Sequence, residues 1–153
     1  KIANSYNIPI IGDGGHNGKI GNIFKCLAAG ASTVMLGGFL SGTDETPGKI
    51  LLKNGKKMKM IRGMAGYVSN NLKNERIGYG KDIDQICPEG VEGYVDYKGD
   101  VNTVLSQIIK GIQSGMSYIG CKNFTELKNK NIEFIKITNS GKIESNSHNI
   151  LKL

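Results

Sequence analysis

The 153-residue sequence has no tryptophan, and arginine occurs only as Arg62 and Arg76. A nucleic-acid-binding surface normally gathers basic side chains and interleaves them with aromatic rings. Here the net charge of +7 comes almost entirely from dispersed lysines, so a nucleic-acid partner is not indicated. The basic surplus still suits a small anionic ligand.

Cysteine is also scarce, with Cys26, Cys87 and Cys121 at wide spacings and no Cys-x-x-Cys motif. His16 and His148 lie far apart in the sequence. This pattern indicates neither a zinc site nor a disulfide framework, so we expect a reducing compartment, the cytoplasm. No signal-peptide pattern and no long apolar run is present, and we expect no membrane partner.

Residues 8–38 predict a strand, a helix and a second, parallel strand. Residues 9–11 are a short apolar run that stops at the glycines of 12–15, as expected of a buried strand that ends in a glycine loop. Apolar residues then recur at helical spacing over 20–28, with Asn17 as the expected cap and Gly30 as the expected end. Residues 33–36 predict a second buried strand.

Glycine follows the carboxyl end of both predicted strands, as Gly14 and Gly15 and again as Gly37 and Gly38. Without Cβ atoms, backbone N–H groups can crowd around an anion, most often a phosphate. In (β/α)8 barrels the loops after strands seven and eight commonly hold a phosphate. Asp13, the acid among these glycines, is well placed to accept hydrogen bonds from sugar hydroxyls. The alternative is that residues 12–15 only make a tight turn.

The next segments predict a loop, a hairpin and a lid. Adjacent Asp44 and Glu45 are either solvated or face a second ligand or a base. Residues 49–61 read as a projecting β-hairpin with an Asn-Gly turn at 54–55. Residues 66–93 lack periodicity, which is typical of a mobile lid, although disorder without a role is the alternative.

The C-terminal third predicts two helices and two strands. We expect a strand at 94–97 and an amphipathic helix at 100–115, capped by Asp100 and closed by Gly115 and Gly120. A capping-box pattern starts a short helix at Asn123. Residues 132–138 predict a last strand, followed by a polar, exposed tail. Only two convincing parallel strands are found, whereas an α/β barrel needs more, so we expect a fragment of a longer polypeptide.

Six segments, in this order and spacing, resemble the C-terminal part of IMP dehydrogenase. They are residues 11–15, 28–37, 42–48, 62–64, 88–93 and 144–148. The related GMP reductases share the first half almost equally well. The resemblance implies an α/β fold: the C-terminal part of a (β/α)8 TIM barrel with a β-hairpin finger and a mobile flap.

By the resemblance, the chain is one segment of a catalytic barrel domain. Barrel strands seven and eight would lie within 8–38, the finger at 49–61, the flap at 63–93, the final helix at 100–115 and the tail at 139–153. The rest of the barrel, with the catalytic cysteine, would lie upstream or on a second chain. A homotetramer is implied.

The implied reaction belongs to purine nucleotide and GMP biosynthesis: IMP is oxidised to XMP by NAD through a covalent cysteine adduct, which is hydrolysed after flap closure. The implied IMP-binding residues are Asp13, Gly14, Gly15, Gly37, Gly38, Gly63, Met64, Ala65 and Glu89. Arg76 and Tyr79 would be catalytic and Glu45 would bind NAD. The carbonyl groups of Glu144, Ser145 and Asn146 would hold a potassium ion for a neighbouring subunit.

The sequence departs from the dehydrogenase pattern at three places. Arg76 and Tyr79 are separated by two residues where the family has adjacent Arg-Tyr. Ile61 replaces a phosphate-binding tyrosine. Gly38 replaces the serine that the dehydrogenases have after Gly37, and GMP reductases have glycine at this position. Two alternatives therefore stay open. One is GMP reductase, which deaminates GMP to IMP with NADPH; the other is a non-catalytic nucleotide-binding segment.

Overall fold

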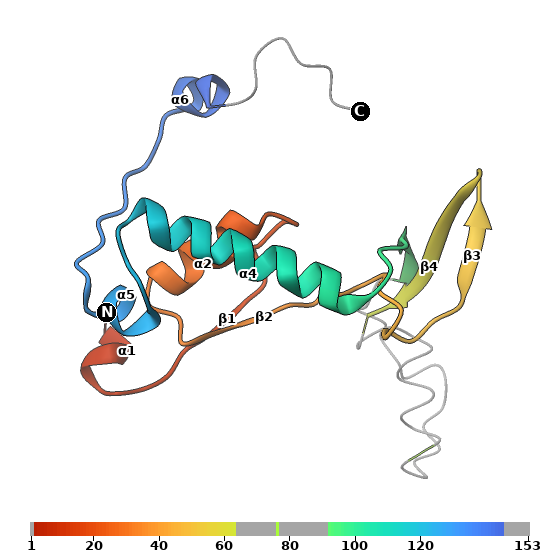
Figure 1. The fold of residues 1–153 in the computed structure, drawn as a ribbon, viewed down its shortest axis with the longest axis horizontal. Coiled ribbons are helices and arrows are strands. Elements are labelled where there is room, and N and C mark those ends of the chain that lie inside the picture. Colours follow the sequence, from red (N-terminus) through yellow and green to blue (C-terminus); the bar gives the residue numbers. More distant parts are fainter. Residues whose placement is uncertain (1, 64–75, 77–91, 146–153) are drawn as a thin grey trace, which may run out of the picture.

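The structure, a computed structural model, describes residues 2–63, 76 and 92–145. Its helices are α1 (Ile2–Ser5), α2 (Ile20–Ala28), α4 (Val101–Tyr118), α5 (Phe124–Asn129) and α6 (Asn139–Glu144). Its strands are β1 (Ile11–Asp13), β2 (Thr33–Met35), β3 (Ile50–Lys53), β4 (Lys56–Arg62) and β5 (Glu92–Asp96). Strands β1 and β2 form a parallel pair, and β3, β4 and β5 form a separate antiparallel sheet at one end of α4 (Figure 1).

The predicted strand–helix–strand unit is present, with β1 paired parallel to β2. The predicted bounds were wrong by one or two residues, because β1 begins at Ile11 rather than at residue 9 and β2 ends at Met35. The prediction that both strands are buried was also wrong, since Ile11 is 61% and Met35 is 51% exposed. Alternate residues of a strand face opposite sides. A Cβ on Gly12 would meet the Cys26 side chain of α2, so Ile11 and Met35 lie on the uncovered face.

Helix α2 begins without a side-chain cap. Its N-cap is Lys19, which makes no capping hydrogen bond, so the prediction of Asn17 as the cap was wrong. Asn17 instead has a left-handed backbone, with φ of 48°, inside the preceding loop. Gly30, with φ of 111°, follows the helix end as predicted.

Helix α4 crosses α2 at two glycines. A Cβ on Gly111 would lie 2.4 Å from the Ile20 side chain, and a Cβ on Gly115 would lie 2.5 Å from the Phe24 ring. The prediction that Gly115 closes the helix was therefore wrong: α4 continues to Tyr118, and Gly120, with φ of 65°, follows its end. Glycine is used here for close helix packing rather than for termination.

The α4 start and the α5 start are capped as the sequence predicts. The Asp100 carboxylate accepts a 2.7 Å hydrogen bond from the Asn102 N–H. At α5 the Asn123 side chain accepts from the Glu126 N–H at 2.9 Å, and the Glu126 carboxylate accepts from the Lys122 N–H at 2.7 Å. Between these helices lies a small core that is formed by Met116, Cys121 and Leu127.

The predicted hairpin is confirmed. Asn54 and Gly55 have φ of 51° and 76°, the two positive values that a two-residue type I′ turn requires. Strand β5 adds to the other edge of β4, with Met58 opposite Asp96 and Arg62 opposite Glu92. The strand predicted at 94–97 is thus present at 92–96, and its pairing with the hairpin is an addition that the sequence did not predict.

The prediction of a strand at 132–138 was wrong. These residues form no strand, and Phe134, Ile135 and Ile137 are exposed. A strand needs a hydrogen-bonded neighbour, and none of the described strands pairs with this segment. The short helix α6 follows, where only an exposed tail was expected, and the Thr138 hydroxyl caps it by accepting from Gly141 N–H at 3.1 Å.

The predicted lid falls almost wholly outside the described residues, which include only Arg76 between positions 64 and 91. Its mobility therefore stays a prediction. Among the residues that the structure does describe, no helix is long and apolar enough to cross a membrane.

Candidate functional site

Two glycine loops leave the same edge of the β1–β2 pair. Asp13, the last residue of β1, lies opposite Met35, the last residue of β2. Because the strands run parallel, the loop at 14–18 and the loop at 37–41 start side by side. The sequence predicted this juxtaposition, and it is the central feature of the site.

The first loop depends on glycine for its backbone conformation. Gly14, Gly15 and Gly18 have φ of 74°, 73° and 68°, a left-handed region that other residues rarely adopt. A Cβ on any of the three would meet no atom of the described residues within 4 Å, so the loop is open on this side toward that part of the chain. The Asp13 carboxylate at the head of the loop is exposed. The loop therefore presents backbone groups and one acid on an open side.

Hydrogen bonds to His16 join this loop to α2. Its carbonyl oxygen accepts from the Lys19 N–H at 2.9 Å and from the Asn22 side chain at 3.0 Å. The His16 side chain is 7% exposed, and its Nε2 has no hydrogen-bond partner in the described part of the chain. These hydrogen bonds thus fix the loop backbone to the start of α2, while the side that carries the Cβ positions of the loop glycines stays open.

The second loop is a tight turn built on Gly37. Its carbonyl oxygen accepts from the Leu40 N–H at 3.1 Å and from the Ser41 N–H at 3.2 Å. Gly37 and Gly38 are exposed, and a Cβ on either would contact no atom of the described residues within 4 Å. In that part of the chain, hydrogen bonds rather than packing at these two positions hold the turn.

A cavity of about 440 Å³ connects the two loops with the start of α4. Seven residues line it: Gly18, Gly38, Phe39, Lys98, Thr103, Val104 and Gln107. Lys98 is the charged residue in this lining. The cavity therefore joins both glycine loops in one open space that carries a positive charge.

Two lysines bind backbone carbonyl groups of the segment after β2. Lys98 Nζ donates to the carbonyl oxygens of Gly38 and Phe39, both at 2.9 Å. Lys59 Nζ donates to those of Thr43 and Asp44, at 2.5 and 2.9 Å. Lys59 is only 2% exposed, so this ammonium group depends on carbonyl oxygens in place of water.

The adjacent acids Asp44 and Glu45 both have protein partners. The Tyr97 hydroxyl donates to Asp44 at 2.7 Å, and the Val101 N–H at the start of α4 donates to Glu45 at 3.0 Å. The hydrogen bond to Asp44, followed by burial and the negative charges of Asp44 and Glu45, raises the pKa of Tyr97 above its ordinary value. Both carboxylates are exposed and keep a second oxygen.

The predicted site residues are brought together only in part. Asp13, Gly14, Gly15, Gly37 and Gly38 share one edge, as described above. Glu45 lies at the start of α4, Gly63 directly follows β4, and Arg76 is exposed. Glu144 ends α6 and Ser145 is its C-cap residue. Five predicted site residues lie outside the described residues: Met64, Ala65, Tyr79, Glu89, and Asn146 of the predicted potassium site.

Sequence reasoning missed Lys98, Lys59 and His16 as parts of this region. In the sequence, Lys98 and Lys59 are two of the dispersed lysines. No local signal distinguishes them from the other lysines, because their role depends on carbonyl groups from a distant segment. Among the described residues, no group of three or more His, Cys, Asp or Glu side chains could hold a metal ion.

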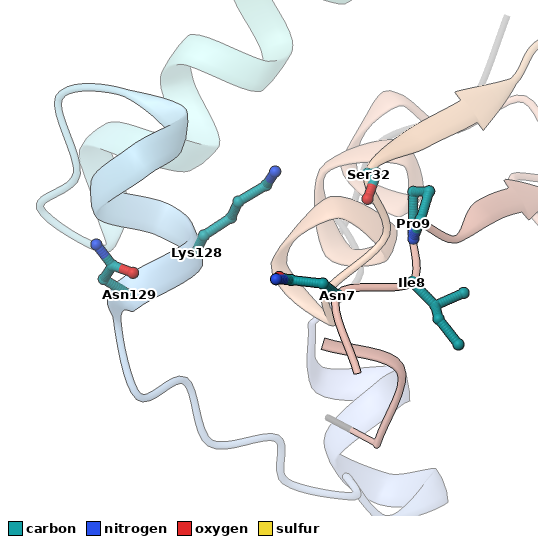
Figure 2. A pocket seen from close by; sticks show the side chains of 6 residues that line it. All are labelled: Asn7, Ile8, Pro9, Ser32, Lys128 and Asn129. Atoms are coloured by element: carbon teal, nitrogen blue, oxygen red, sulfur yellow. The ribbon is translucent and has the colours of Figure 1, made fainter. Parts of the chain in front are cut away.

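A second cavity, of about 490 Å³, lies at the opposite end of the strands (Figure 2). Residues 7–9 precede β1, Ser32 precedes β2, and Lys128 and Asn129 come from α5. Figure 2 shows Lys128 reaching from α5 into the space while Ile8 points away from it. No residue of either glycine loop lines this second cavity, so it is separate from the site described above.

Comparison with known proteins gives consistent matches. The model of the IMP dehydrogenase / GMP reductase domain matches residues 1–148. The chain is 44% identical over 158 residues to a GMP reductase of Leishmania donovani, covering 100% of this chain and 31% of that protein. It is 45% identical over 150 residues to an inosine-5′-monophosphate dehydrogenase of Aquifex aeolicus, covering 97% of this chain and 30% of that protein.

A solved structure matches as well. It is a crystal structure of a GMP reductase variant from Trypanosoma brucei in complex with guanosine 5′-monophosphate, with a TM-score of 0.84 and 44% identity. The match covers 98% of this chain and 30% of that one. The chain thus spans about three-tenths of the length of the relatives it matches. From the matched residues and the shared α/β fold, we conclude that this chain belongs to the IMP dehydrogenase / GMP reductase family.

Proposed function

We propose that the chain is the nucleotide-binding, C-terminal part of an oxidoreductase that oxidises IMP to XMP with NAD. The observation that carries this proposal is the meeting of two glycine loops at one edge of the β1–β2 pair, with Asp13 exposed at the head of the first. Guanosine 5′-monophosphate in the Trypanosoma brucei structure supports a nucleoside monophosphate as the ligand.

In this proposal the phosphate binds to backbone N–H groups of Gly14, Gly15, Gly37 and Gly38. The open space above these glycines lets a bulky anion approach the backbone. The Asp13 carboxylate accepts hydrogen bonds from the ribose hydroxyls. The base would then extend toward Gly63, where β4 ends, and toward Met64, Ala65 and Glu89.

The proposal includes NAD and a potassium ion. NAD, when bound, supplies the hydride acceptor. Glu45 fits a contact with it, because the carboxylate is exposed and its bond to Val101 N–H uses only one of its two oxygens. Glu144 and Ser145 end α6, and carbonyl oxygens at a helix end are of the kind that hard cations take.

We also propose that β1 and β2 are strands seven and eight of a (β/α)8 barrel in a homotetramer. The uncovered face with Ile11 and Met35 supports this, since such apolar surface is normally buried. The hairpin β3–β4 would be the finger, and residues 63–93 the flap that carries Arg76 and Tyr79. The remaining strands and the reactive cysteine come from the rest of the polypeptide or from a second chain.

GMP reductase is the second candidate, and two observations favour it. Gly38 follows Gly37 as in GMP reductases, and the Leishmania and Trypanosoma relatives are GMP reductases by name. In that case NADPH reduces GMP to IMP with release of ammonia.

One pair of assays on the complete protein separates the candidates. We expect NADH formation with IMP and NAD, and no NADPH consumption with GMP. Activity only in the second assay would overturn the dehydrogenase proposal in favour of GMP reductase. Binding of IMP without turnover in either assay would leave the non-catalytic nucleotide-binding reading. A control with Asp13→Ala should lose nucleotide binding in either case.

A further inference from the structure

Lys98 joins two segments that are far apart in the sequence. It lies between β5 and α4, yet its backbone N–H donates to the Gly42 carbonyl at 2.8 Å and its Nζ donates to the carbonyl groups of Gly38 and Phe39. The loop that follows β2 is therefore bound both by the main chain and by the side chain of one residue.

The side-chain contact determines which way a peptide group faces. In a trans peptide the C=O and N–H bonds point in opposite directions. Because Lys98 binds the Gly38 carbonyl, the N–H of the same peptide group, which belongs to Phe39, faces away from the ammonium group. Gly38 has no side chain, and its Cβ position has no neighbour within 4 Å among residues 2–63, 76 and 92–145, so packing by these residues does not fix this orientation.

Lys98 also places a positive charge beside both glycine loops. It is the charged member of the cavity lining that includes Gly18 and Gly38. Its ammonium group has three N–H donors, and the two carbonyl groups account for two of them. Two acids at the start of α4 have other partners: Glu45 accepts from Val101 N–H and Asp100 from Asn102 N–H.

We infer that Lys98 is a positioning residue for the phosphate group of the bound nucleotide. It holds the Gly38 and Phe39 carbonyl oxygens on its own side of the loop, away from the anion, and adds a positive charge to the cavity that both glycine loops share. The inference rests on the proposed function, in which a nucleoside monophosphate binds at the glycine loops, and it adds a determinant of phosphate recognition to that site.

Lys59 provides a matched control within the same segment. Its ammonium group also binds two consecutive carbonyl groups, those of Thr43 and Asp44, but it does not line the cavity. Replacing Lys59 tests the general effect of releasing this segment. Replacing Lys98 tests that effect together with the effect on the phosphate.

The experiment is calorimetric titration of the complete protein with IMP and with inosine, which lacks the phosphate. We expect Lys98→Met to weaken IMP binding about tenfold or more, the scale of a charge-assisted hydrogen bond. Inosine binding should change by less than about twofold, because the nucleoside does not contact this charge. Lys98→Arg should restore most of the IMP affinity, and Lys59→Met should leave the IMP-to-inosine affinity ratio unchanged.

Three results would contradict this. Equal weakening of IMP and inosine by Lys98→Met would show a structural role only, and an unchanged IMP affinity would remove any role. If Lys98→Met does not fold, Lys98→Gln is titrated in its place, with the same two outcomes. A wild-type protein that binds neither IMP nor GMP would overturn the proposed function itself, and the inference with it, whereas the first two results leave that function standing.

Discussion

Substitution of Gly115 by alanine tests the close contact between α2 and α4. The new methyl group would lie 2.5, 2.6 and 2.9 Å from the Cδ1, Cγ and Cε1 atoms of the Phe24 ring. Contacts this short force a shift of the ring or of the helix. Phe24 also packs against the cluster of Met116, Cys121 and Leu127, so a shift of the ring disturbs that cluster.

Two opposing terms set the size of the effect. Overpacking a well-filled contact typically costs about 1–3 kcal/mol. Replacing glycine by alanine inside a helix gains about 1 kcal/mol. We expect the clash to outweigh the gain, because three ring atoms are involved and the ring is attached to a neighbouring helix. Gly115→Ala should therefore lower the free energy of unfolding by about 1 kcal/mol or more.

The assay is urea unfolding of a double-mutant cycle with Phe24→Ala. When the ring is absent, Gly115→Ala should change sign and stabilise the protein by about 0.5–1 kcal/mol, giving a coupling energy of about 2 kcal/mol. Gly21→Ala in α2 is the matched control, since a Cβ there meets no atom within 4 Å in the part of the chain that the structure describes. A coupling energy below about 0.5 kcal/mol would refute the reasoning that Phe24 is what excludes a side chain at position 115.

Substitutions at three further positions give distinct outcomes. Asp100→Ala removes the cap of α4 and should cost about 1 kcal/mol in urea unfolding, whereas Asp100→Asn should cost much less; equal costs would argue against capping. Gly42→Ala should cost about 2 kcal/mol or more, because φ is 91° and the Cβ would lie 2.3 Å from the Asp96 carbonyl oxygen. An unchanged unfolding midpoint would contradict that geometry. Tyr97 has a raised pKa because it donates to Asp44, so the folded state favours the neutral phenol. Its stabilisation is complete below the ordinary tyrosine pKa and is lost as the pH rises through the raised value; unfolding measured against pH should show this step in the wild type and not in Tyr97→Phe.

Local sequence signals predicted the elements whose cause is local. The Asn54-Gly55 turn, the Asp100 cap and the Asn123 capping box all depend on a few consecutive residues, and all three are present. The parallel β1–β2 pair was predicted for a related reason. A helix between two short apolar runs carries the chain back to the starting end of the first strand, so the second strand can pair with it in parallel. With it came the juxtaposition of the two glycine loops.

Features that depend on distant residues could not be predicted in this way. Gly30 and Gly115 look alike in the sequence, yet only Gly30 follows a helix end, because Gly115 contacts Phe24 of another helix. The apolar run at 132–138 has a strand-like composition but no neighbouring strand among the described residues. Lys59 is buried because residues 43–44 lie over its ammonium group. Lys98 is part of the site because its ammonium group binds carbonyl oxygens of residues about sixty positions earlier in the sequence.

The pairing of Arg62 with Glu92 has a consequence for protein engineering. These residues are opposite each other on β4 and β5, so the segment between them leaves and re-enters the protein at adjacent points of one sheet. For such a closed loop, each doubling of length costs only about 0.6 kcal/mol of closure entropy. The segment at 63–91 can therefore be exchanged for that of a relative, shortened or extended by an inserted reporter domain. We expect the β4–β5 register to be retained through these changes.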